Sequence, residues 1–249
     1  MIPRLFALFL LVPVFGLALV GSARADQSQP PIVVELFTSQ GCSSCPPADK
    51  YFGELVKRPE ILAIAFHIEY WNYIGWPDPY SKPWATRRQR DYASKLKQRF
   101  VYTPEIVVQG TAEGVGSERE TIEALIRNAS AKPQPHPDLK LHWRQDGALL
   151  VDLGDGASPQ GEPATVWLVG FDRMRTNQIL AGENQGKTSW DHHPVRSFKR
   201  LGGWAGFSQE FVVPPEDAKT LGDYGAAVLV QLNGTGPILT AASIELPKN

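Results

Sequence analysis

The first part of the chain alternates between apolar runs and a segment with helical spacing. Residues 31–37 and 61–66 are nearly unbroken apolar runs rich in Ile, Val and Leu, which predicts two buried β-strands. Between them, residues 48–56 place their apolar side chains on one face, which predicts an amphipathic helix. Pro46 and Pro47 favour a helix start, because the amide hydrogen that proline lacks has no partner in the first helical turn.

The next segments continue this mixture of helices and strands. Residues 69–80 follow no simple period and are rich in Tyr and Trp, which predicts an ordered aromatic loop. Residues 83–99 are highly charged and predict a helix that ends before Thr103-Pro104, since the residue before a proline disfavours helical backbone. Three further elements are predicted: a strand at 105–109, a short strand at 111–116 and a helix at 117–130.

The pattern changes after a proline-rich stretch at residues 132–137, which we interpret as a stiff linker. Beyond it, short β-rich runs are separated by Gly, Pro, Asp and Asn, which is typical of an all-β, sandwich-like module. The predicted domains are therefore residues 31–131 and residues 138–249. The predicted strands of the second domain lie at 139–143, 148–153, 164–171, 195–201, 206–213 and 226–232.

The N-terminus has the pattern of a secretory signal peptide. Arg4 precedes an almost unbroken apolar run from residue 5 to residue 20, and Ala23-Arg24-Ala25 has small residues where a signal peptidase cleaves. We expect residues 1–25 to be a signal peptide cleaved after Ala25, which predicts a periplasmic or secreted protein. The alternative, a membrane anchor, is less favoured because the run is short for a span and contains Pro13 and Gly16. No stable membrane span is expected after cleavage.

Charge points to no particular partner. The 249 residues carry 25 Lys and Arg against 26 Asp and Glu, for a formal net charge of −1. Nucleic-acid binding usually needs a clear excess of positive charge, so no nucleic-acid partner is predicted.

The candidate chemistry lies in the chain's two cysteines, Cys42 and Cys45. In an oxidising compartment such a pair is usually a disulfide. Two cysteines three positions apart close a very small loop, so their disulfide removes little entropy from the unfolded chain. This favours a redox role over a purely stabilising one.

The order of motifs resembles the thioredoxin-like superfamily over residues 31–130. Cys42-Ser-Ser-Cys45 follows a predicted buried strand, and Thr103-Pro104 directly precedes another. The resemblance implies an α/β thioredoxin-like N-terminal domain followed by the all-β, sandwich-like domain. It also implies that Pro104 is cis and lies beside the cysteines, and that Thr103 offers backbone hydrogen bonds to a bound chain.

The whole mature chain is similar to a family of uncharacterised exported bacterial proteins. The similarity lies in residues 35–49, with the sequence ELFTSQGCSSCPPAD, in AFHIEYW at 65–71 and in GENQG at 182–186. No agreed activity accompanies that family, so this resemblance supports architecture more than a reaction.

Cys42 is the predicted nucleophile, because it precedes the helix and is expected to be the more exposed cysteine. Helix N-termini favour the thiolate, although a helix starting at Pro46 would leave both cysteines in a turn. Cys45 would resolve the mixed disulfide. Glu35 interrupts an apolar strand and is a candidate proton acceptor by resemblance; the alternative is that it faces water at the strand end.

Other candidates carry weaker signals. Trp71 and Trp76 could contact a substrate, or the aromatic loop could be core. His67 is more readily explained as a structural histidine. Asp191-His192-His193 is a poor metal site, because adjacent side chains on a strand point in opposite directions.

The sequence therefore predicts an exported thiol–disulfide oxidoreductase that acts on a protein or on a small thiol or disulfide. Two alternatives remain. Cys42, Cys45 and His67 could bind a soft ion such as Cu(I), or the chain could be a non-catalytic binding module with an inert disulfide. No cofactor and no resident metal are predicted.

Overall fold

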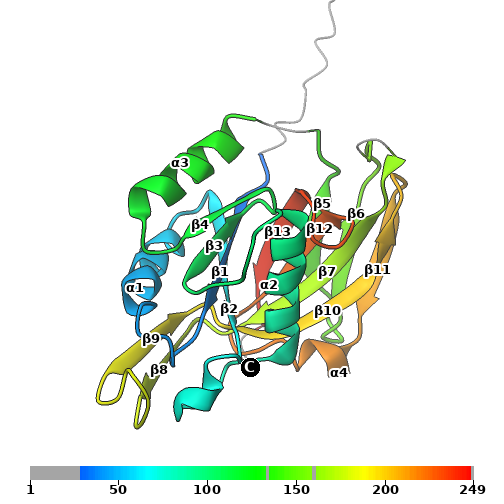
Figure 1. The fold of residues 1–249 in the computed structure, drawn as a ribbon. Helices are drawn as coiled ribbons and strands as arrows, with labels where there is room; N and C mark the ends of the chain where they lie inside the picture. Colours follow the sequence, from blue (N-terminus) through cyan, green and yellow to red (C-terminus); the bar gives the residue numbers. More distant parts are fainter. Residues whose placement is uncertain (1–28, 133–134, 159–160, 248–249) are drawn as a thin grey trace, which may run out of the picture.

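The computed structural model describes residues 29–132, 135–158 and 161–247. In these ranges the chain forms thirteen strands in four sheets, four α-helices and one short 3-10 helix (Figure 1). The predicted signal peptide, residues 1–25, lies outside the described residues. None of the helices in the described ranges is long and apolar enough to cross a membrane.

A mixed four-stranded sheet forms the N-terminal part of the structure. Its strand order is β2-β1-β3-β4, with β1 parallel to β2 and antiparallel to β3. The strands are β1 (Ile32–Thr38), β2 (Ile61–His67), β3 (Glu105–Val108) and β4 (Ala112–Val115).

Helices cover both faces of this sheet because both faces are apolar. Side chains alternate along β1, so Val34 and Leu36 pack against α1 (Pro46–Leu55) and α3 (Arg119–Ser130). Val33 and Phe37 point to the other face, where they share a hydrophobic cluster with α2 (Pro83–Lys95). A short 3-10 helix, η1 (Asn72–Ile74), lies in the aromatic loop between β2 and α2.

The remaining strands form two sheets and a separate hairpin. One sheet has the order β10-β7-β12-β13 and another the order β11-β6-β5, while β8 and β9 pair only with each other. The elements are β5 (Leu139–Trp143), β6 (Leu149–Leu153), β7 (Ala164–Phe171), β8 (Met174–Gln178), β9 (Thr188–His192), β10 (Val195–Trp204), β11 (Gln209–Val213), α4 (Pro215–Ala218), β12 (Gly225–Leu232) and β13 (Ile238–Glu245).

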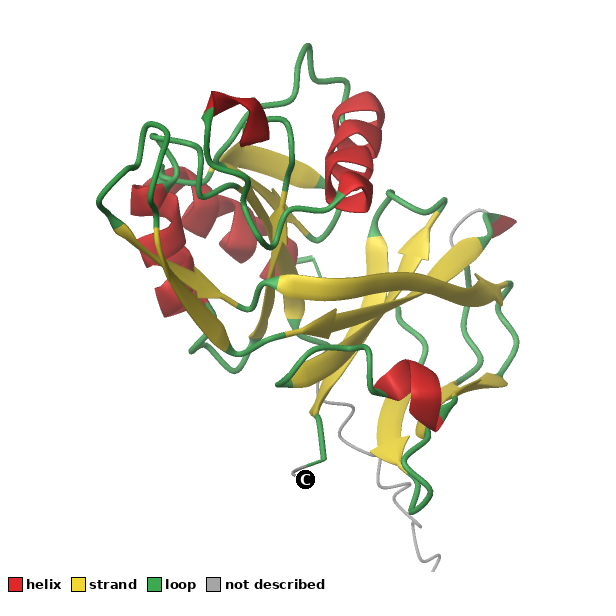
Figure 2. Ribbon diagram, turned by 90° about the horizontal axis from the view of Figure 1, so that it is seen from below, coloured by secondary structure: helices red, strands yellow, loops and turns green. Residues whose placement is uncertain are grey.

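The predicted fold class is wrong. We expected an α/β thioredoxin-like N-terminal domain followed by an all-β domain, but the described chain is mostly β (Figure 2). Its N-terminal part does not form a clear α/β domain of its own. One hydrophobic cluster contains Val33 and Phe66 from the first sheet together with Val169 and Leu229 from the second.

Main-chain contacts join the two parts as well. The Ala65 amide donates to the His193 carbonyl over 3.0 Å, and the Ile238 amide donates to the Gln109 carbonyl over 3.0 Å. A local apolar pattern predicts strands and helices but carries no information about which sheets share a core. The proposed boundaries at residues 131 and 138 stay a prediction.

The β8–β9 hairpin was not predicted from the sequence. Its strands are polar and mostly exposed on one side, so they lack the apolar runs that predicted strands elsewhere in the chain. β13 was not predicted either. Figure 1 shows the hairpin beside α1, and Gly53 of α1 lies directly against the His192 ring. The hairpin thereby brings residues from the C-terminal half to the cysteines.

Candidate functional site

A disulfide joins Cys42 and Cys45 in the turn between β1 and α1. The helix begins at Pro46, because Pro46 and Pro47 occupy positions that need no amide hydrogen bond. Cys45 is the residue that caps the helix, and its carbonyl accepts from the amides of Ala48 and Asp49. Both cysteines therefore lie in the turn rather than in the helix.

Both cysteines are buried, so the greater exposure expected of Cys42 is almost absent. Cys42 is 1% exposed and Cys45 is 0% exposed, whereas Ser43 and Ser44 between them are exposed. Asn184, in the loop between β8 and β9, is one cause of this burial. Its Nδ2 donates to the carbonyls of Gln40, over 2.9 Å, and of Cys42, over 2.8 Å. The C-terminal half thus holds the turn that carries the disulfide.

The segment before β3 lies against the same turn. The Thr103–Pro104 peptide bond is cis, as the resemblance implied. The Ser44 hydroxyl donates to the Thr103 carbonyl over 3.3 Å, and Cys42 Sγ lies 3.4 Å from Ser44 Oγ. Thr103 and Pro104 are therefore brought to the cysteines, even though more than fifty residues separate them in the sequence.

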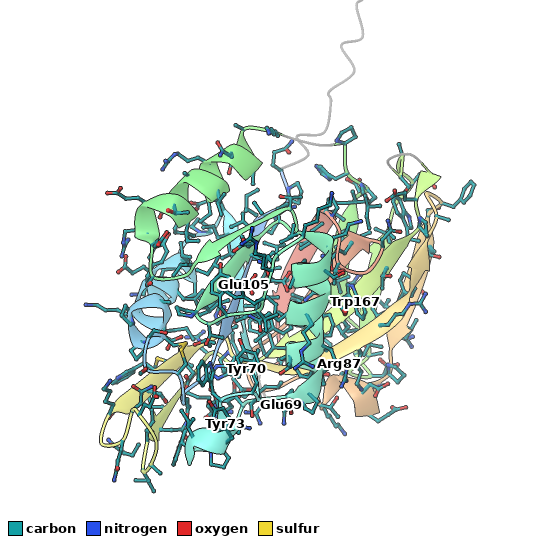
Figure 3. All side chains as sticks on the ribbon, viewed as in Figure 1. Glu69, Tyr70, Tyr73, Arg87, Glu105 and Trp167 are labelled. Atoms are coloured by element: carbon teal, nitrogen blue, oxygen red, sulfur yellow. A yellow bond between two sulfur atoms is a disulfide. The ribbon has the colours of Figure 1, made fainter. Side chains whose placement is uncertain are left out.

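The two tryptophans singled out in the sequence tie the aromatic loop to this site. Trp71 Nε1 donates to Thr103 Oγ1 over 2.7 Å, and Trp76 Nε1 donates to Gln40 Oε1 over 2.9 Å. Both tryptophan side chains are half-buried, so part of each indole ring is exposed to solvent. Tyr73 stacks on Trp71 and is 79% exposed. Figure 3 shows Tyr73 in the aromatic loop, near Glu69 and Tyr70.

Gln40 links the disulfide turn to two buried carboxylates. The main-chain amide of Gln40 donates to Asp78 Oδ2 over 2.8 Å, and its side-chain Nε2 donates to Asp191 Oδ2 over 2.7 Å. His67 lies between the same carboxylates, with Nδ1 2.7 Å from Asp78 Oδ2 and Nε2 3.9 Å from Asp191 Oδ1. Burial alone would lower the pKa of His67, but Asp78 and Asp191 raise it to about 9. His67 is thus a charged histidine that holds the network together.

Asp49 adds a further carboxylate beside this network, and it was not predicted as a site residue. Burial raises the pKa of Asp49 to about 7, although the hydrogen bond from Thr38 Oγ1 over 2.8 Å and the charge of His67 oppose the shift. Asp49 lies in the first turn of α1, four residues after Cys45. The sequence feature that could have identified Asp49 is an acidic residue in the first turn of the helix, four positions after Cys45.

Glu35 is not brought to the cysteines. It lies in the middle of β1 on the face opposite α1, where Arg88 Nε donates to Oε2 over 2.5 Å and Arg88 Nη2 donates to Oε1 over 2.9 Å. The Tyr92 hydroxyl also donates to Oε1. The alternation of side chains along the strand decides this, because residue 35 shares its face with Val33 and Phe37.

The three residues Asp191, His192 and His193 have different partners. Asp191 joins the Gln40 network, the His192 ring lies against Gly53, and His193 Nδ1 lies 2.9 Å from the Ala63 carbonyl. In the part of the chain that the structure describes, no group of three or more His, Cys, Asp and Glu side chains is arranged to hold a metal ion.

Fold and site together define a mostly β protein in which a loop of the C-terminal half is hydrogen-bonded to a Cys-x-x-Cys disulfide turn. The chain belongs to a family described as "Protein of unknown function (DUF1223)", whose model matches residues 33–231. This match spans the N-terminal sheet, the disulfide turn and the hairpin.

A solved structure is similar over almost the whole chain. The X-ray crystal structure of a protein from Agrobacterium tumefaciens has a TM-score of 0.77 and 27% sequence identity, and the match covers 90% of this chain and 97% of that one. No curated protein matches this chain. The comparisons therefore establish the family and support the fold, but they bring no activity.

Proposed function

We propose that this chain is an exported thiol–disulfide oxidoreductase that reacts through Cys42 and Cys45. The observation that carries the proposal is the disulfide itself, which spans three positions at the start of a helix. A loop of this size contributes about 2 kcal/mol by the chain-entropy relation, which is less than a disulfide that closes a long loop contributes. A role in reversible disulfide exchange therefore explains this disulfide better than a role in stabilising the fold.

The reaction exchanges one disulfide for another. A thiolate of the partner attacks Cys42 Sγ, the Cys42–Cys45 bond breaks, and Cys45 leaves as a thiolate that takes up a proton. A second partner thiol, once deprotonated, attacks the partner sulfur of the mixed disulfide and releases Cys42. The partner is then oxidised to a disulfide and Cys42 and Cys45 are reduced to thiols. The reverse sequence reduces the partner.

The surroundings of the turn support this chemistry. The exposed Ser43 and Ser44 leave one side of the turn open to solvent, and Thr103 and Pro104 lie next to it. A partner that carries a thiol or disulfide, either a protein or a small molecule, would approach from this side. Because both sulfurs are buried, attack on Cys42 requires a local displacement of the turn or of the loop that carries Asn184.

The burial of both cysteines also favours a second candidate, an inert structural disulfide. The redox equilibrium separates the two. The mature protein would be incubated in graded glutathione buffers, its thiols trapped by alkylation and its mass measured. A potential between about −120 and −270 mV would match known exchange catalysts, whereas a value below about −300 mV would mark a structural bond.

A trapping variant tests the assignment of roles. In Cys45→Ser, Cys42 should form a mixed disulfide with glutathione that cannot be resolved, and mass spectrometry would detect the adduct. Cys42→Ser is the matched control and should form far less adduct at Cys45. Equal adducts in both variants would contradict Cys42 as the attacking residue. Absence of any adduct, together with a potential below about −300 mV, would reject the oxidoreductase.

A further inference from the structure

A cavity of about 500 Å³ lies between α1 and the β8–β9 hairpin. Asp49, Lys50 and Gly53 of α1 line one wall, and Thr188 to Trp190 with His192 line the other. Neither cysteine sulfur lines it. Cavities of this size bind small molecules in many proteins, so its lining indicates the kind of ligand it would accept.

The charged groups of the lining come from both walls. Lys50 and Lys57 belong to the α1 side and Lys187 to the opposite side. In the described part of the chain, Lys50 and Lys57 have no ion pair, whereas the carboxylate of Glu54 already binds Arg119 over 2.6 Å. Three cations thus face the cavity while one of its two carboxylates is already paired. The lining favours an anion with charge at both ends.

The base and rim of the cavity are apolar. Ile179 is buried, Pro46 and Gly53 add nonpolar surface, and the Trp190 ring is 56% exposed at the rim. A ligand that fits this lining has an apolar body between its charged ends, because the body would cover Ile179 and Trp190 while the ends contact lysines.

We propose that this cavity binds a small organic dianion with carboxylates at both ends of an apolar body, held by Lys57 on one wall and Lys187 on the other. This binding site is independent of the proposed exchange reaction, since the ligand need not contain sulfur. Lys187 Nζ already contacts Asn184 Oδ1 over 2.9 Å, and Asn184 in turn holds the Cys42 carbonyl. A bound anion therefore lies one side chain away from the disulfide turn.

Asp49 gives the site a pH dependence with a defined sign. Its pKa of about 7 means that it is about half protonated at neutral pH, and the protonated carboxyl can donate a hydrogen bond to an anion. The bound anion disfavours the carboxylate form, so affinity should rise as pH falls from 8 to 6. The other charged groups that face Asp49 or the cavity are His67, Asp78, Asp191, Lys50, Glu54, Lys57, Lys187 and His192. Among them, burial and the charge of Lys57 lower the pKa of His192 below its usual 6.5, and burial raises the pKa of Asp191.

Isothermal titration calorimetry of the mature, disulfide-bonded protein at pH 6 tests the site with two probes. Adipate and suberate are plain dicarboxylates with a carboxylate at each end of an apolar chain, and suberate is the longer of the two. We expect at least one to bind with a Kd below about 1 mM. Hexane-1,6-diol and 1,6-diaminohexane, which have the same length as adipate without negative charge, should bind at least about tenfold more weakly.

Variants locate the binding. Lys57→Ala and Lys187→Ala should each weaken the binding probe about fivefold. Lys219 is an exposed lysine outside the cavity, so Lys219→Ala should leave the affinity for the probe unchanged. Asp49→Asn should remove the approximately tenfold loss of affinity expected between pH 6 and pH 8.

The proposal is overturned if neither probe binds, if the diamine binds as tightly as the dianion, or if the two lysine variants bind like the unchanged protein. Circular dichroism of each variant confirms that it is folded. Anion binding without any disulfide exchange would reject the oxidoreductase and keep this site. Disulfide exchange with glutathione without anion binding would reject this binding site and keep the oxidoreductase.

Discussion

At the scale of single residues, buried charge is the dominant feature of this protein. Glu35 and Arg88 form an ion pair in which both side chains are almost fully buried. His67 is a second buried cation, held between Asp78 and Asp191. Buried charges are tolerated only when partners compensate for the lost water, so each of these residues depends on the others.

Removing Arg88 should destabilise the protein strongly. Arg88→Met would leave the Glu35 carboxylate buried without its cation, and the expected loss is about 3–5 kcal/mol in the free energy of unfolding, measured with urea. Arg87→Met, at the exposed neighbouring position, should change it by less than about 0.5 kcal/mol. The double variant Glu35→Leu/Arg88→Met should recover part of the loss. Similar stabilities for all three variants would show that the pair is not the reason for the effect.

His67 should make stability depend on pH in the alkaline direction. Its pKa is raised from 6.5 to about 9 in the folded protein, so its contribution is fully present below pH 6.5 and is lost as pH rises through 9. One pKa unit corresponds to about 1.4 kcal/mol, which predicts a decline of a few kcal/mol over this range. The free energy of unfolding, measured at intervals from pH 6 to 9.5, should show this slope. His67→Gln should start lower and be flatter, and an equal slope in both proteins would contradict the assignment.

At the scale of elements, the β8–β9 hairpin is the unexpected part of the site. It contributes Asn184, which donates to two carbonyls of the disulfide turn, and Asp191, which binds Gln40. It also forms one wall of the cavity beside α1. A single hairpin thus connects the C-terminal half of the chain to the disulfide turn and to the cavity.

Loss of the Asn184 amide should make the disulfide more reactive. Asn184→Ala removes both hydrogen bonds to the turn, and each is expected to contribute about 1 kcal/mol. The rate of disulfide reduction by dithiothreitol should therefore rise by about fivefold to thirtyfold, measured by trapping the thiols over time. Gln185→Ala, at the exposed neighbouring position, is the control and should react at the original rate. A rate in Asn184→Ala equal to that of the control would show that the loop does not limit access.

At the scale of the whole molecule, the N-terminal sheet and the sheet β10-β7-β12-β13 share one hydrophobic core. Residues from the N-terminal sheet, from α2 and from the sheet β10-β7-β12-β13 belong to one hydrophobic cluster. The backbone bonds at Ala65 and Gln109 add direct links between the two halves. The free energy of folding therefore depends on both halves together rather than on the small disulfide loop.

Removing the disulfide should leave the whole molecule folded. The double variant Cys42→Ser/Cys45→Ser loses the constraint of a very small loop, which predicts a decrease of at most about 2 kcal/mol in the free energy of unfolding. Urea unfolding followed by fluorescence would measure it. Loss of cooperative unfolding in the double variant would instead show that the disulfide is essential to the fold.

The sequence by itself determined the elements that have strong local signals. The apolar runs of β1, β2 and β7, the helix start at Pro46 and the pairing of the two cysteines follow from neighbouring residues alone. It also indicated that Thr103 and Pro104 belong near Cys42, through a resemblance rather than through spacing.

Only the tertiary structure decided the rest, because long-range contacts leave no local pattern. Glu35 was expected at the cysteines, yet the alternation of β1 directs it to Arg88 on the opposite face. Cys42 was expected to be the more exposed cysteine, yet it is buried, and Asn184, over 140 residues away, donates to its carbonyl. The shared core follows from the packing of two sheets around α2, which depends on the three-dimensional path of the chain and not on the pattern within any one segment.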